Sequence, residues 1–159
     1  VRGGRGLHPQ EEKSTYKIEK VLNDHPIWVR ALSQFVNDGN RVIFIIGNHD
    51  GELALPRLQE FLLDQFPEDI RDNFIIKCEI GGEYEPHQGV LLKHGHEYEV
   101  AHQFDPKSSV VTDEEGKRYF IPPWGSYYVT RVINKFKEDR GHINAVRPIK
   151  KAMINGLIY

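Results

Sequence analysis

An unbroken run of five apolar residues, 42–46, constrains the fold of this chain more than any other feature. It is rich in β-branched side chains and is followed at once by the polar sequence Gly-Asn-His-Asp-Gly. Such a run, closed by glycine, predicts a strand buried on both faces, as in a sheet covered by helices. Sheets of this kind bind ligands beyond the carboxyl ends of their strands. We therefore expect Asn48, His49 and Asp50 to lie where the chain carries its chemistry.

A second predicted strand, residues 90–92, ends in histidines. The sequence Lys-His-Gly-His follows it and supplies His94 and His96. The two strand ends together carry three imidazoles and one carboxamide. Imidazole nitrogen suits Zn, Mn and Fe, and an amide oxygen can complete the shell of a hard cation. This combination predicts a metal site.

Ordinary structural roles compete for the same residues. An Asn-His pair after a strand is commonly a turn, and Asp50 suits turn closure as well as it suits orienting His49. His102 has no required role, and we interpret it as a surface residue. Cys78 lies in a predicted strand, where packing is favoured over reactivity.

The other expected elements are amphipathic helices and one hairpin. The helices are predicted at residues 15–22, 26–36, 52–66, 126–137 and 146–158. Residues 73–80 read as a strand that pairs with 90–92 as a hairpin. Residues 105–120 are polar and show no clear period.

Composition narrows the class of protein. A chain of 159 residues is one domain by size, and its net charge of -2 gives no general attraction to nucleic acid. The single cysteine excludes an intrachain disulfide, and no apolar run approaches the length of a membrane span. We expect a cytoplasmic protein of unknown oligomeric state. The opening sequence lacks Met, so we expect a portion of a longer chain.

The strand followed by GNHD at 47–50, and the strand followed by HGH at 94–96, resemble the calcineurin-like metallophosphoesterases. The resemblance covers mainly residues 27–104 and implies an α/β fold, a two-layered β-sandwich flanked by helices. It also implies two divalent metals (Mn, Fe or Zn) bridged by a water or hydroxide. Asn48 and His94 would bind the second metal. His49 would be the catalytic proton donor, assisted by Asp50, and His96 would contact substrate at a position that varies in the motif.

Three motifs of that family are missing. Asp-x-His, Gly-Asp-x-x-Asp and Gly-His-x-His, which supply the first metal and the bridging carboxylate, are absent from these residues. We therefore predict that residues 1–104 form the central part of a metallophosphoesterase domain. Residues 105–159 would form a helical insertion or cap. This portion alone is expected to bind metal weakly or not at all, and to hydrolyse nothing measurable.

The stretch after His96 is similar to the bacterial branch related to UDP-diacylglucosamine hydrolases, where a helical insertion caps the site. An apolar cap would favour a small phosphomonoester, phosphodiester or pyrophosphate with an acyl or nucleobase part. A helix packed on the fold's own core is equally compatible with the pattern. Two alternatives stay open: a phosphoesterase-like protein-binding scaffold without catalysis, and a mononuclear zinc site in an unrelated fold.

Overall fold

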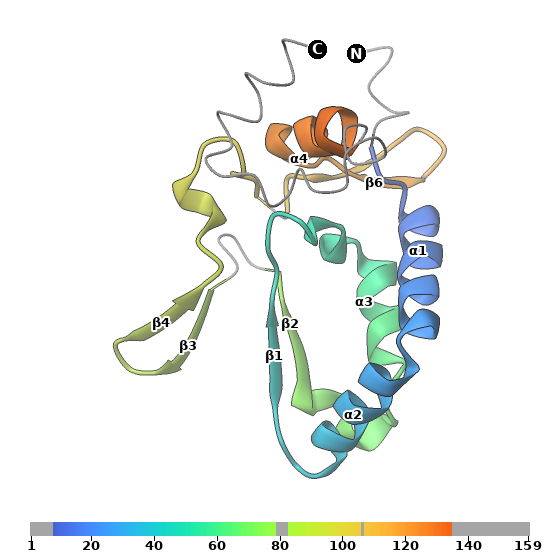
Figure 1. The fold of residues 1–159 in the computed structure, drawn as a ribbon, viewed down its shortest axis with the longest axis vertical. Coiled ribbons are helices and arrows are strands. Elements are labelled where there is room, and N and C mark those ends of the chain that lie inside the picture. The colour runs from blue at the N-terminus through green and yellow to red at the C-terminus, as the bar shows by residue number, and fades with distance from the viewer. Residues whose placement is uncertain (1–7, 79–82, 106, 135–159) are drawn as a thin grey trace. The chain divides into compact units, whose positions relative to one another are not determined.

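The computed structural model describes residues 8–78, 83–105 and 107–134 (Figure 1). The chain divides into two compact units between Pro123 and Trp124. Within those ranges helices and three two-stranded sheets occur together, so the predicted mixed α/β class is confirmed. The two-layered sandwich and the cap stay predictions, and the predicted helix at 146–158 lies outside the described residues. Within those described ranges no helix is long and apolar enough to cross a bilayer.

Three helices of the first unit form close to where the sequence predicts them. They are α1 (Glu11–Asp24), α2 (Pro26–Asn37) and α3 (Pro56–Leu63). Proline stands in the first turn of α2 and of α3, where its missing N–H and fixed φ are no disadvantage. Pro56 also divides the single helix expected at 52–66, because the residue before a proline avoids helical angles. A separate 3-10 helix, η2 (Gly51–Ala54), therefore precedes α3.

The predicted strand at 42–46 forms as β1 (Val42–Ile45). It pairs in parallel with β2 (Phe74–Lys77), with Val42 opposite Phe74. A short 3-10 helix, η3 (Glu68–Asn73), leads into β2. The side chains of β1 are half-buried, although their apolar run predicts burial on both faces. In the described part of the chain β1 is hydrogen-bonded to β2 alone, which leaves its other edge uncovered by a strand.

The predicted hairpin between residues 73–80 and 90–92 is wrong. β4 (Val90–Lys93) pairs instead with β3 (Glu83–His87) in an antiparallel hairpin. Pro86, which suggests a turn in the sequence, lies inside β3 at a shift in the strand register. A proline gives no N–H to the ladder and is tolerated at such irregularities. The turn comes later, at Gly89, whose φ of 80° suits a hairpin loop.

Residues 105–120, which show no period in the sequence, contain a second antiparallel hairpin. It joins β5 (Val110–Thr112) to β6 (Arg118–Phe120) and belongs to the first unit. The Asp113 carboxylate accepts the backbone N–H groups of Glu115 and Lys117, both at 2.9 Å, and so closes the turn. A strand of three residues is too short for an alternation of apolar and polar residues to be recognised in the sequence.

The second unit begins with α4 (Trp124–Tyr128), which continues as a π-helix, η5 (Val129–Ile133). The predicted helix at 126–137 thus begins two residues early, directly after Pro123. Its last three residues lie outside the described ranges.

Two apolar clusters hold the first unit together. The first consists of Ile46, Leu53, Leu55, Leu58 and Phe120, and the second of Val36, Phe66 and Phe74. The first cluster combines four residues that follow β1 in sequence with Phe120 of β6. It therefore anchors both ends of the turn that follows β1.

Candidate functional site

The Gly-Asn-His-Asp turn is fixed by one of its own side chains. The backbone N–H of Gly47 donates to Oδ1 of Asp50 at 3.0 Å, and the Asp50 carbonyl accepts from Leu53 N–H at 2.9 Å. Asp50 therefore closes the turn, which is the ordinary role weighed from the sequence. Within this turn Asn48 is buried and His49 is exposed. The turn thus presents the His49 imidazole to solvent.

The His-Gly-His turn follows β4 and depends on a left-handed glycine. Gly95 has φ 91°, a conformation that other residues rarely adopt, and η4 (His96–Tyr98) begins immediately after it. This reversal brings Nδ1 of His94 to 3.3 Å from Nδ1 of His96. The His96 ring is 5% exposed and stacks on Phe104, with ring centroids 4.9 Å apart. Its burial favours a role in holding His94 over the predicted contact with substrate.

The two turns meet. A Cβ atom built on Gly47 would lie 2.5 Å from both Cδ2 and Nε2 of His94, so the His94 ring rests against the Gly47 backbone. The turns that follow the two predicted strands therefore lie side by side. The roles of Asn48, His49, Asp50, His94 and His96 in binding or catalysis stay predictions.

His102 belongs to the same cluster, and its interpretation as a surface residue is wrong. Its Nδ1 lies 3.1 Å from Nδ2 of Asn48, and its ring centroid lies 6.3 Å from that of His49. The amide nitrogen can only donate, so His102 Nδ1 accepts and the Nε2 atom carries the ring proton. That Nε2 lies 3.6 Å from Glu99 Oε2. No spacing in the sequence signals this contact, because it joins residues 54 positions apart.

The surroundings of His96 favour its neutral form. Burial, and then the charge of His94, lower the pKa of His96 below its ordinary value. When two neutral rings form a hydrogen bond between their Nδ1 atoms, one ring donates and the other accepts. The donating ring then has a lone pair on Nε2, and the accepting ring carries a proton on Nε2. The buried Nε2 of His96 has no hydrogen-bond partner in the described part of the chain. A proton on His96 Nε2 would leave the lone pair on His94 Nε2, beside the Gly47 turn.

Lys93 forms ion pairs on both sides of the His-Gly-His turn. Its Nζ lies 2.7 Å from Glu97 Oε1 and 3.4 Å from Glu83 Oε2. The hydrogen bond from Lys93 holds the pKa of Glu97 below its usual range. These contacts tie β4 to η4 on either side of Gly95, and so limit the movement of the two histidines.

The donor set can be compared with the needs of a metal ion. Across residues 8–78, 83–105 and 107–134 no three His, Cys, Asp or Glu side chains are grouped to hold a metal. Asn48 and His94 offer two neutral donors, whereas catalytic zinc takes three protein ligands plus water. Two donors are therefore fewer than one ion needs. The other ligands of a two-metal centre stay a prediction.

The chain matches no protein-family model, no curated protein and no solved structure. The likeness to metallophosphoesterases therefore rests on the two motifs and on their contact.

The arrangement supports one kind of chemistry better than others. His49 and His94 are exposed, whereas Asn48 and His96 are buried. A neutral ring nitrogen can bind a cation, and a neighbouring imidazole can move a proton. The cluster thus carries candidate cation ligands beside a candidate general acid.

Proposed function

We propose that this chain carries part of the active site of a metal-dependent phosphoesterase. Its substrates would be small molecules with a phosphomonoester, phosphodiester or pyrophosphate bond. One observation carries the proposal: the His94 ring lies against Gly47, so the turns of the GNHD and HGH motifs are in contact. Either motif alone is compatible with an ordinary turn, but unrelated turns have no reason to meet in this way.

Each residue has a role that follows from its position. Asn48 and His94 would hold one divalent cation (Mn, Fe or Zn) between the carboxamide oxygen and an imidazole nitrogen. A bound cation of this kind lowers the pKa of water and supplies a hydroxide nucleophile. His49, which is exposed beside them, would give a proton to the leaving oxygen. Asp50 fixes the turn that places His49 there.

His102 acts on Asn48 rather than on substrate. Because the Asn48 amide nitrogen points to His102 Nδ1, the carboxamide is held with its nitrogen on that side. The oxygen, which is the atom a cation binds, then lies on the other branch of the amide. Partners that orient a ligand in this way typically change metal affinity 10–100-fold when removed, by the order of magnitude known for outer-shell residues.

The proposal is tested by titrating Mn²⁺ into the chain with calorimetry and assaying bis(4-nitrophenyl) phosphate. Two donors predict weak binding that is lost in Asn48→Ala and in His94→Ala. The matched control is His87→Ala, at an exposed histidine in β3. If Mn²⁺ binding is unchanged in His94→Ala, the proposal that His94 binds the cation is wrong. Micromolar affinity with turnover would contradict the view that these residues hold only part of the site.

A second candidate is a phosphoesterase-like scaffold that binds another protein without catalysis. It is favoured by the exposure of large apolar side chains on α2: Ile27 is 75% exposed and Trp28 54%. Exposed apolar patches commonly mark interaction sites. Self-association or partner binding that is lost in Ile27→Ser would favour the scaffold.

A further inference from the structure

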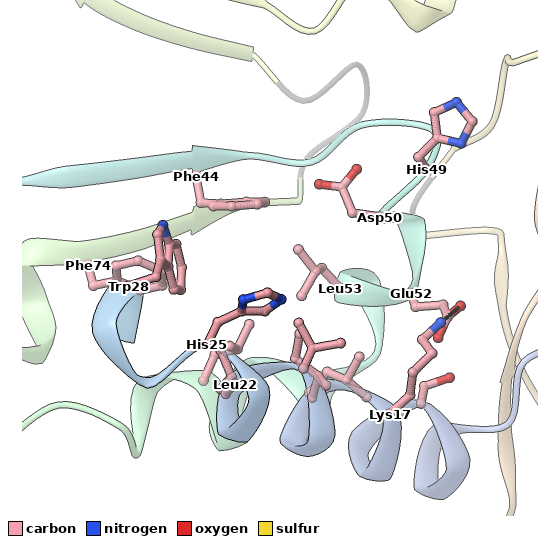
Figure 2. A pocket seen from close by; sticks show the side chains of 15 residues that line it. Lys17, Leu22, His25, Trp28, Phe44, His49, Asp50, Glu52, Leu53 and Phe74 are labelled. Carbon is pink, nitrogen blue, oxygen red and sulfur yellow. Dashed lines mark hydrogen bonds and ion pairs between the residues drawn. The ribbon is translucent and has the colours of Figure 1, made fainter. Parts of the chain in front are cut away.

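A cavity of about 510 Å³ lies between α1 and the β1–β2 sheet (Figure 2). One wall is a single face of α1, with residues spaced three or four apart. They are Ser14, Lys17, Ile18, Val21, Leu22 and His25. Cavities that bind small molecules span roughly 300–1,000 Å³ and combine apolar walls with a few polar groups. This cavity meets both conditions.

One end of the cavity is aromatic. Trp28 from α2, Phe44 from β1 and Phe74 from β2 gather there, with the His25 ring reaching in from the end of α1 (Figure 2). Trp28 is 54% exposed, so much of its indole is not covered by the protein. Aromatic rings stack or meet edge to face with other rings, which adds to the free energy of burying them. The walls therefore suit a planar aromatic group.

The other end is polar and belongs to the turn after β1. In Figure 2 the Asp50 carboxylate points into the cavity, and His49 lies at its rim. Lys17 Nζ pairs with Glu52 Oε1 at 2.5 Å on the opposite side of this rim. A ligand with its ring among the aromatic side chains would thus carry its other end toward residues 48–50.

We propose that the cavity binds a planar aromatic group carried by the phosphoester substrate. The inference rests on the proposed function for the substrate's phosphate, whereas the aromatic site itself is defined by the cavity. The substrate would then be an aromatic phosphoester, whereas the two motifs alone indicate only its phosphate group.

The test follows the indole N–H signal of Trp28 by nuclear magnetic resonance during ligand titration. The chain has two tryptophans, so Trp124→Phe leaves the Trp28 signal alone. The probes are 1-naphthol, 1-naphthyl phosphate and octyl phosphate. We expect both naphthyl compounds to shift the signal saturably, and octyl phosphate to bind at least about tenfold more weakly, since it gains no ring contacts.

A filling substitution locates the site. Val21→Phe adds volume at the α1 wall and should weaken naphthyl binding about tenfold, since an occupied cavity excludes the ring. Val111→Phe in β5 is the control, because Val111 is similarly exposed but lies outside the cavity lining. Failure of both naphthyl compounds to bind, or equal binding of octyl phosphate, overturns the inference. If 1-naphthol binds but phosphate and Mn²⁺ add nothing to its affinity, the cavity assignment stands and the phosphoesterase proposal falls.

Discussion

The imidazole of His94 lies so close to Gly47 that a methyl group on that residue would overlap it. The built Cβ lies 2.5 Å from His94 Nε2 and 2.9 Å from Asp50 Oδ1. Because the His94 ring approaches its backbone so closely, position 47 requires glycine. The lack of a side chain there allows the two turns to touch.

Gly47→Ala should separate the turns. The added methyl forces the His94 ring and the Asp50 carboxylate to move, and overpacking of this kind costs about 1–3 kcal/mol. The free energy of unfolding, measured in urea, should fall by that amount. Adding His94→Ala to Gly47→Ala should recover most of the loss. If the two substitutions are additive, the contact is not the cause.

His102→Leu should release the carboxamide of Asn48. Leucine fills a similar space but accepts no hydrogen bond, so the side-chain amide signals of Asn48 should shift and broaden. Mn²⁺ affinity should fall about 10–100-fold. His102→Gln offers an acceptor and should restore part of both. Unchanged Asn48 amide signals in His102→Leu would show that the contact does not orient the amide.

Glu11→Ala should destabilise the first unit. Glu11 Oε2 accepts from Arg118 Nε at 2.7 Å and Oε1 accepts the Arg57 backbone N–H at 3.0 Å, so one buried carboxylate joins α1, α3 and β6. Losing charged hydrogen bonds of this kind costs about 1.5–3 kcal/mol. Glu12→Ala is the matched control, because Glu12 is exposed and should change the unfolding free energy by less than about 0.5 kcal/mol. Equal effects of the two substitutions would contradict the assigned role.

Stability should fall in mild acid because of His96. Burial and the charge of His94 lower its pKa in the folded chain, while the unfolded chain keeps a value of about 6.5. Between these values the unfolded chain binds more protons, so the unfolding free energy decreases as pH falls below about 6.5. Urea unfolding at a series of pH values should show this slope, and His96→Gln should lessen it. A His96 pKa at or above 6.5, measured from its ring protons, would contradict the prediction.

Local patterns of the sequence predicted the parts of this fold that depend on neighbouring residues. The apolar run at 42–46 closed by Gly47 formed β1 and its turn, and Pro26 set the start of α2. These features follow from side-chain periodicity and from the backbone limits of proline and glycine, which act within a few residues.

Contacts between segments far apart in the chain could not be predicted from the sequence. The partner of β4 is β3 rather than residues 73–80, although each candidate strand has a suitable pattern. His102 looks like any surface histidine until Asn48 is placed beside it. The two motif turns meet even though β1 and β4 belong to different sheets.

The sequence by itself located most of the candidate site residues, because glycine-bounded polar turns after apolar strands are recognisable from neighbouring residues alone. Only the tertiary structure decided which of these residues touch and what lies beside them. The His94–Gly47 contact and the aromatic cavity under α1 come from packing between segments far apart in the chain. Such packing depends on shape and volume across the whole unit, which no local pattern specifies.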